Sequence, residues 1–289
     1  FEKLKIETVE NYPNYLLEVL KSLAPKKCNK EPKVVILTPG SLNSAYYEHS
    51  FLADLMGVEL VQGNDLFVDE SITYMKTTRG PEKVDIIYRR IDDKFIDPIT
   101  FDSSSLIGIP GLFDSYKSGY VNICSAPGSG IADDKAIYSY IPEIIKFYLG
   151  EEPILENVKT WRCCEEDAKK YVLNNLNKLV VKEVHGSGGY GLLIGSKSSK
   201  REIEIFRKKI LLNPENYIAQ PILELSSVPI FDKKKLSPRH VDLRPFCLVG
   251  ANKTKLVDGG LTRVALNPGS LVVNSSQGGG VKDTWILNE

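Results

Sequence analysis

The sequence lacks an excess of charge of either sign. Lysine and arginine together number 37, and so do aspartate and glutamate, so the formal net charge is zero. A broad footprint for nucleic acid or for a membrane surface needs a basic surplus, so neither is expected as a partner. A local basic pocket remains compatible with a neutral whole, and a nucleotide together with a small-molecule or peptide substrate is the expected kind of partner.

Long apolar runs and targeting signals are also missing. No uninterrupted apolar run is long enough to span a bilayer, and no signal peptide is recognisable. The hydrophobic share of 42% and the charged share of 26% are typical of globular proteins. The 289 residues can form two ordinary domains or one large one, and the cytoplasm is the expected location.

Cysteine is scarce and lacks the spacing of a framework. The five cysteines are an odd number, two of them are adjacent, and no C-x-x-C occurs. This usage indicates a reducing compartment and thiols that are at least partly buried. The three histidines are scattered, so no metal site is predicted from the residues of this chain.

Short apolar runs alternate with helical patterns in the first half of the chain. This order favours an open α/β sheet. Helices are predicted over 15–23 and 46–56, and strands over 34–37, 58–61, 72–76, 84–88 and 121–124, with a turn at 79–81.

The composition shifts near residue 154, and the second half contains longer polar segments. A helix over 133–149 should break before Pro142, with Lys135 near its start. Further helices are predicted over 167–176 and 201–211, strands over 217–221, 240–249, 255–265 and 270–273, and a lysine-rich loop over 226–238. The predicted domains are a leading helix and linker (1–32), an α/β domain (33–153) and a nucleotide-binding domain (154–289).

The stretch 179–195 reads as a strand carrying Lys182, a glycine-rich turn and a second strand. Glycines at 186, 188, 189 and 191 remove side chains where a backbone can close over phosphate oxygens. The pattern matches G-x-G-x-x-G, but a dinucleotide fold needs a helix after the glycines, and here a strand follows. A protein kinase places its lysine after the glycines and carries H-R-D and D-F-G, which this chain lacks. A nucleotide site is favoured, and a plain hairpin with a surface lysine stays open as the alternative.

Several segments together carry a family resemblance. They are YRRIDD at 88–93, ADDKAIY at 132–138, VKE at 181–183 with its glycines, DLRP at 242–245 with GGLTRVA at 259–265, and VVNSSQGGG at 272–280 with KDTW at 282–285. As a set they resemble the circularly permuted ATP-grasp family (type 2), related to glutathionylspermidine synthase. The resemblance implies an open α/β pre-ATP-grasp domain followed by an ATP-grasp domain with antiparallel sheets.

The resemblance also implies an ATP site. Lys135 and Lys182 would reach the phosphates, and Gln220 and Glu224 would lie by the adenine and ribose. The glycine loop would fold over the phosphates through Gly186, Ser187, Gly188, Gly189 and Gly191.

Members of the superfamily form an acyl phosphate from a carboxylate and ATP, which an amine then attacks. Arg263 is the candidate that would stabilise the oxyanion, and the second choices are Arg244 and Lys282. Substrate contacts are expected from Arg90, Arg244, Asn274 and Lys282. For each arginine a surface or interstrand salt bridge remains the alternative, and Asp242 with Arg244 can form such a pair.

One expected feature is missing. ATP-grasp ligases typically bind Mg²⁺ through a carboxylate-x-Asn pair, and no Glu or Asp here is followed two positions later by Asn. The chain also begins with Phe1 instead of methionine, so we expect a fragment of a longer protein whose Mg²⁺ ligands lie outside it.

The leading hypothesis is an ATP-dependent carboxylate–amine ligase, with nucleotide binding expected more firmly than turnover. The alternatives are a non-catalytic nucleotide-binding or scaffold module with the same fold and a sugar- or nucleotide-processing enzyme outside the superfamily.

Overall fold

The computed structural model describes residues 4–186, 191–232, 235–273 and 279–288. Contacts between Cα atoms divide the chain into two units. The first unit comprises Phe1–Ser129, Pro245–Gly260 and Trp285–Glu289, and the second comprises Gly130–Arg244 and Leu261–Thr284. The domain boundaries expected after residues 32 and 153 stay a prediction.

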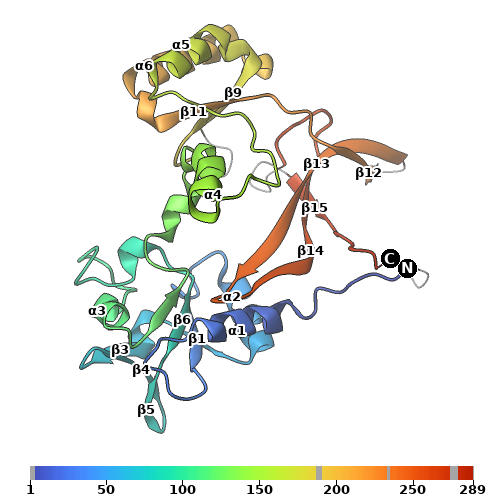
Figure 1. Ribbon diagram of the computed structural model, residues 1–289. Helices are drawn as coiled ribbons and strands as arrows, with labels where there is room; N and C mark the ends of the chain where they lie inside the picture. The colour runs from blue at the N-terminus through green and yellow to red at the C-terminus, as the bar shows by residue number, and fades with distance from the viewer. Residues whose placement is uncertain (1–3, 187–190, 233–234, 274–278, 289) are drawn as a thin grey trace. The chain divides into compact units, whose positions relative to one another are not determined.

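The first unit is built on a parallel sheet in the order β2-β1-β6-β7. Figure 1 labels its two central strands, β1 and β6. Its strands are β1 (Val34–Leu37), β2 (Glu59–Val61), β6 (Ile86–Arg89) and β7 (Asn122–Cys124). All four residues of β1 are buried, as expected for a central parallel strand with both faces covered. The open α/β sheet predicted from the sequence is confirmed.

Two helices cover one face of this sheet, α1 (Tyr12–Ser22) and α2 (Tyr46–Met56). Val34 and Ile36 of β1 pack with Leu16 and Leu20 of α1 and Met56 of α2. The bounds of α2 are as predicted, whereas α1 begins three residues earlier than the predicted residue 15, because Pro13 is accommodated in its first turn.

The other face of the sheet contacts a second core, in which Val35 and Leu37 pack with Leu66, Met75 and the short helix α3 (Leu112–Lys117). Leu66 and Met75 belong to a three-stranded antiparallel sheet that the sequence reading missed in part. Its strands are β3 (Leu66–Asp69), β4 (Ile72–Thr77) and β5 (Gly80–Lys83). The turn predicted at 79–81 is therefore wrong for Gly80 and Pro81, which pair with Thr77 and Lys76.

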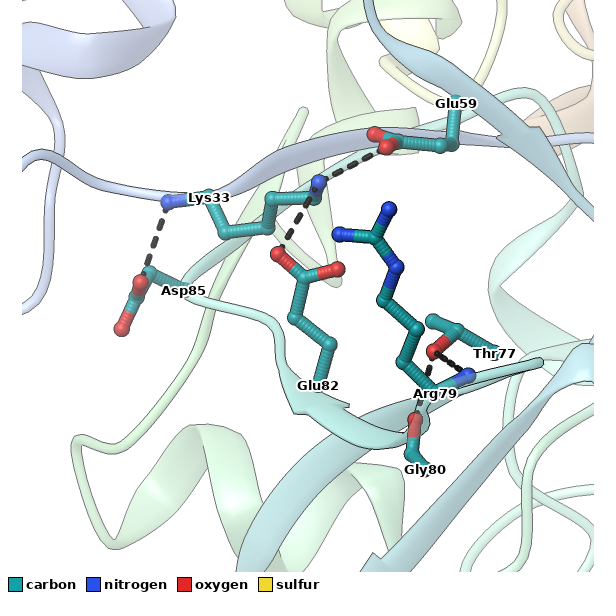
Figure 2. A network of polar contacts seen from close by, with 7 residues as sticks. All are labelled: Lys33, Glu59, Thr77, Arg79, Gly80, Glu82 and Asp85. Carbon is teal, nitrogen blue, oxygen red and sulfur yellow. Dashed lines mark hydrogen bonds and ion pairs between the residues drawn. The ribbon is translucent and has the colours of Figure 1, made fainter.

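A polar network ties this hairpin to the amino ends of the parallel strands (Figure 2). The Lys33 ammonium lies 2.7 Å from Glu59 and 3.1 Å from Glu82. The Lys33 backbone N–H donates to Asp85, which is 1% exposed and also pairs with Lys83 at 2.7 Å. Arg79 is exposed at the tip of the same hairpin.

The second unit contains an antiparallel sheet in the order β10-β9-β11-β8. Its elements are β8 (Trp161–Arg162), α5 (Glu166–Asn175), β9 (Leu179–Glu183), β10 (Leu192–Ile194), α6 (Lys200–Leu212) and β11 (Tyr217–Pro221). Residues of α5 and α6 such as Val172 and Ile210 pack with Val181 and Leu193 on one face of the sheet. The predicted strand before the glycines and the strand after them are both confirmed, and β10 pairs antiparallel with β9.

The segment before this sheet is less regular than predicted. Two 3-10 turns, Ser129–Asp133 and Ile137–Tyr140, precede α4 (Ile141–Leu149). Pro142 lies in the first turn of α4, so the predicted break is confirmed. Lys135 lies in a turn between the 3-10 turns and not at the start of a long helix, which corrects the predicted helix over 133–149.

A third sheet has the order β12-β13-β14-β15. Its strands are β12 (Ser227–Asp232), β13 (Lys235–Val249), β14 (Thr254–Ala265) and β15 (Gly279–Lys282). The lysine-rich loop predicted over 226–238 is wrong, because β12 and the start of β13 form a hairpin there. The strand predicted over 270–273 is wrong as well, since the described residues of that segment form no ladder.

Among the described residues, no helix combines the length and the apolar character that crossing a membrane requires.

Candidate functional site

The sheet of the second unit has one face covered by helices and one that lines a pocket. Side chains alternate along a strand, so Val181 faces the helices while Val180 and Lys182 face the opposite side. The pocket on that side has a volume of about 310 Å³. Its lining residues are Val180, Lys182, Leu192, Ile194, Gln220, Pro221, Ile222, Leu223, Leu225, Asp242, Leu271, Val272 and Val273.

Lys182 is half-buried in this pocket. Its Nζ donates to Oε1 of Gln220 at 2.7 Å, and Nε2 of Gln220 donates to Oγ1 of Thr160 at 2.9 Å. Burial lowers the pKa of Lys182, and the positive charge of Lys135 lowers it further. Lys182 and Gln220, both predicted as site residues, are therefore in direct contact.

Lys135 supplies a second ammonium group close to the same strand. Its backbone N–H donates to the carbonyl of Val184 at 3.2 Å. Its Nζ donates to the same carbonyl at 3.3 Å and to the carbonyl of Gly186. The two lysines predicted to reach phosphates are thus coupled through charge, and Lys135 is held against the segment that leads into the glycines.

The glycine-rich turn is described only at its two ends. Gly191 has a φ of +67°, and a Cβ built there would lie 2.5 Å from the Glu183 side chain, so both backbone and space favour glycine. Gly186 donates through its backbone N–H to the Glu183 carbonyl at 3.3 Å. The predicted site residues Ser187, Gly188 and Gly189 lie outside the described residues.

Apolar side chains form most of the pocket wall. The run Leu271, Val272 and Val273, which does not form the predicted strand, lines the pocket instead. A slot between such a wall and the aliphatic residues of β9 and β10 suits a flat, weakly polar ring system. Glu224 is exposed and is not among the lining residues, so its predicted place by the ribose stays a prediction.

Arg263 lies on β14, opposite Val281 of β15. Its Nε is buried and has no hydrogen-bond partner among the described residues. A buried donor without an acceptor is uncommon in folded proteins, and one explanation is a ligand that the structure does not contain. The geometry is compatible with a role toward a developing negative charge.

The remaining predicted residues of this unit have structural contacts. Arg244 pairs at 3.1 Å with Asp242 on the same strand, as the alternative of a structural pair anticipated, and Lys282 donates to the Pro229 carbonyl at 2.8 Å. Asn274 lies outside the described residues.

Sequence reasoning missed Arg239. It is 6% exposed and donates to Asp232 at 2.9 Å and to the carbonyls of Leu266 and Pro238. Its surroundings read as a lysine-rich loop, so nothing in the sequence signals a buried arginine.

Arg90 belongs to the first unit, at the end of β6, and is exposed. Its guanidinium donates to the Tyr88 hydroxyl at 3.3 Å. The neighbouring Arg89 is occupied by Asp93 at 2.5 Å and by the carbonyls of Ser125 and Ile91. Arg90, and not Arg89, is therefore available to a ligand.

Among the described residues, no three His, Cys, Asp or Glu side chains come together as a metal site would require. The described carboxylates therefore do not fit a protein-built Mg²⁺ site. The pocket joins an apolar wall to the Lys182 ammonium, and the Lys135 ammonium, which acts on Lys182 through its charge, lies against the same strand outside the lining. This combination suits a nucleotide.

The chain is similar to several known proteins. A family model described as circularly permuted ATP-grasp type 2 matches residues 1–265. An uncharacterised protein of Synechocystis sp. is 53% identical over 287 residues, which cover 99% of this chain and 60% of the relative. A protein of Frankia alni named "Putative glutamate--cysteine ligase 2-3" is 41% identical over 283 residues, covering 98% of this chain and 32% of the relative. The crystal structure of VanG D-Ala:D-Ser ligase from Enterococcus faecalis has a TM-score of 0.39 at 12% identity, covering 79% of this chain and 76% of that one.

Proposed function

The chain belongs to the circularly permuted ATP-grasp type 2 family, and on that basis we propose that its second unit binds ATP. We propose further that the chain belongs to an ATP-dependent carboxylate–amine ligase that acts through an acyl phosphate, and that this ligase is longer than the chain. The chain spans 60% of the Synechocystis relative and 32% of the Frankia alni relative, so the activity of the whole protein belongs to the proposal.

The observation that carries the proposal is the pair Lys182 and Lys135. Burial penalises an ammonium group, and two ammonium groups near each other repel, so both effects lower the pKa of Lys182. The negative charge of a bound polyphosphate would offset both the cost of burying the ammonium group and the repulsion between the two ammonium groups. A phosphate site needs positive groups that an anion stabilises, and the ammonium groups of Lys182 and Lys135 are such groups.

The other pocket residues have complementary roles in this proposal. The apolar wall formed by Val180, Leu192, Ile194 and Leu271 would hold the adenine ring, and Gln220 would orient the Lys182 ammonium. ATP supplies the phosphoryl group that activates the carboxylate. Arg263 would donate to the oxyanion that forms when the amine attacks, because its Nε has no partner among the described residues.

Mg²⁺ also belongs to the proposal. Because the described carboxylates do not form a metal site, we assign no step to the ion within this chain. In the proposal, its protein ligands would be a carboxylate-x-Asn pair outside this chain. The kinship with glutathionylspermidine synthase and the identities of the carboxylate and the amine likewise remain proposals.

The same observation favours a second candidate function, a module that binds nucleotide without turning it over. Phosphoryl transfer depends on divalent metal between the β- and γ-phosphates. If the missing ligands are not supplied from elsewhere, the pocket would retain nucleotide affinity alone. Measuring ATP consumption by this chain and by the longer protein separates the two candidates: turnover by neither, with binding by both, supports the module.

The proposal is tested by the affinity for ATP, measured calorimetrically, in the Lys182→Ala variant. Loss of a charged hydrogen-bond donor to phosphate should weaken binding about ten-fold or more. Lys208→Ala is the matched control, because Lys208 is exposed on α6, which packs on the other face of the sheet.

Wild-type affinity for ATP in Lys182→Ala, with the thermal midpoint unchanged, would show that the pocket is not the nucleotide site. Equal losses in Lys182→Ala and Lys208→Ala would also contradict the assignment, since only one of the two lysines faces the pocket.

A further inference from the structure

The carboxyl ends of the parallel strands in the first unit carry polar side chains that the nucleotide pocket does not use. Thr38 follows β1 and Arg90 follows β6, and the Arg90 backbone N–H donates to the Leu37 carbonyl at 2.8 Å. Thr38 continues the alternation of Val34 and Ile36, so it lies on the sheet face that α1 and α2 cover. Ligands of open α/β sheets gather at this edge.

Three more side chains meet there. His49, in the first turn of α2, is 3% exposed, and its Nδ1 lies 2.9 Å from Oγ1 of Thr38. The Tyr88 hydroxyl accepts a hydrogen bond from Arg90 at 3.3 Å. Tyr12 begins α1 and interacts electrostatically with both Tyr88 and Arg90. We call Tyr12, Thr38, His49, Tyr88 and Arg90 the carboxyl-edge cluster.

The carboxyl-edge cluster has a single permanent charge. Arg90 is exposed, and within the described ranges its guanidinium contacts the Tyr88 hydroxyl and no carboxylate. Burial, and then the nearby Arg90, lower the pKa of His49, so its imidazole is neutral near pH 7. Burial raises the pKa of Tyr12, so its hydroxyl stays protonated. Within the cluster, one cation thus lies among neutral groups; outside the cluster, the Glu48 carboxylate also acts on His49.

We propose that the carboxyl-edge cluster binds the carboxylate of a small molecule. The planar guanidinium of Arg90 matches the two oxygens of a carboxylate, and its single charge balances the single charge of that group. A phosphate dianion would leave one charge unbalanced. The Tyr88 hydroxyl, which accepts from Arg90 at 3.3 Å, can donate its own proton to the same oxygens. That this ligand is a substrate rests on the proposed ligase function, whereas the binding itself does not.

The test uses N-acetylglycine as the probe and N-acetylglycinamide as its uncharged counterpart. On the ¹⁵N-labelled chain, N-acetylglycine should cause saturable NMR shifts of the Arg90 Nε–H and of the backbone amides that follow β1, and the amide should cause none. Arg90→Gln should weaken binding about ten-fold or more, since it removes a charged bidentate contact. Arg79→Gln makes the same change at the exposed hairpin tip and should bind as wild type.

Several outcomes would overturn the proposal. They are equal shifts with the amide, no saturable shift, unchanged affinity in Arg90→Gln, and tighter binding of inorganic phosphate than of N-acetylglycine. If Arg90→Gln fails to fold, Arg90→Lys takes its place. Lysine keeps the positive charge but cannot donate to both carboxylate oxygens as a planar guanidinium does, so this variant should bind N-acetylglycine with intermediate affinity. Lys182→Ala should retain N-acetylglycine binding while it loses ATP binding, so failure of one proposal is distinguishable from failure of the other.

Discussion

Two arginines of the β12–β15 sheet show how differently the same side chain can be held. Arg239 is 6% exposed and has an ion pair and carbonyl acceptors, whereas the buried Nε of Arg263 has no partner among the described residues. A buried polar group stabilises the fold only when its hydrogen bonds are made. We interpret Arg239 as structural and Arg263 as a residue retained for a ligand.

This contrast predicts opposite effects of the same substitution. Arg263→Met should leave the free energy of unfolding unchanged or raise it by about 1 kcal/mol, because it removes an unpaired donor. Arg239→Met should lower it by about 2 kcal/mol, because it breaks the pair with the partly exposed Asp232 and leaves the Leu266 carbonyl without a partner. Urea unfolding of both variants measures the difference, and a larger loss in Arg263→Met would contradict the interpretation.

His49 is expected to make stability depend on pH. Burial, and then Arg90, lower the pKa of His49, while Glu48 acts in the opposite direction. The unfolded chain takes up the proton near pH 6.5 and the folded chain only below that. The neutral His49 therefore contributes to the free energy of unfolding above about pH 6.5, and this contribution is lost as the pH falls through the pKa of His49 in the folded chain. The free energy of unfolding changes there by at most about 1.4 kcal/mol per pH unit.

His49→Gln should flatten that part of the curve of unfolding free energy against pH. His185→Gln is the control, because the His185 side chain is 78% exposed. A slope that is unchanged in His49→Gln, or equally reduced in both variants, would assign the pH dependence to other groups.

At the scale of single elements, the sequence predicted best where burial and periodicity agree. The fully apolar β1 and the helix α2 have the predicted bounds, β9 and β10 lie on either side of the glycines as predicted, and β11 has the separately predicted bounds. Lys182 was predicted from its place on the strand before the glycines, and Gln220 from the family resemblance. Alternation along the paired strands β9 and β11 explains why the two side chains share a face.

Proline and lysine misled the prediction at edge strands. Pro81 lies on β5 and Pro229 on β12, and each of these strands is at the edge of its sheet. An edge strand tolerates proline because its outward N–H has no partner in the ladder. The apolar run 271–273 misled in the opposite way: its burial comes from lining the pocket and not from pairing in a sheet.

One glycine of the second unit is required by packing rather than by a turn. A Cβ on Gly195 would lie 1.8 Å from the carbonyl oxygen of Leu176, a backbone atom that cannot move aside easily. Gly195→Ala should therefore lower the free energy of unfolding by about 3 kcal/mol.

Gly150 provides the control for this substitution. It ends α4 with a φ of +69° and has no heavy atom within 4 Å of a built Cβ, so Gly150→Ala should cost only the backbone strain of about 1 kcal/mol. Thermal unfolding of both variants tests the order, and a smaller loss for Gly195→Ala would mean that the backbone relaxes around the added methyl group.

At the scale of the whole molecule, the sequence carries no signal for the points at which the chain passes between the two units. The chain passes from one unit to the other after residues 129, 244, 260 and 284, and two of these points fall inside the strands β13 and β14. Strand ends and composition shifts are the signals that a sequence offers for boundaries, and neither marks a crossing within a continuous strand. The family motifs at 242–245 and 259–265 were recognisable as residues, but their distribution over two units was not.

The pairing of the two chain ends has a practical consequence. Ile6 and Leu287 form an antiparallel bridge, and Glu7 and Asn288 make backbone hydrogen bonds across it at 2.9 Å each. Polypeptides fused to either end would therefore leave the first unit from neighbouring points. Two fluorescent proteins attached there would lie within energy-transfer range, whereas a purification tag at one end would crowd a fusion at the other.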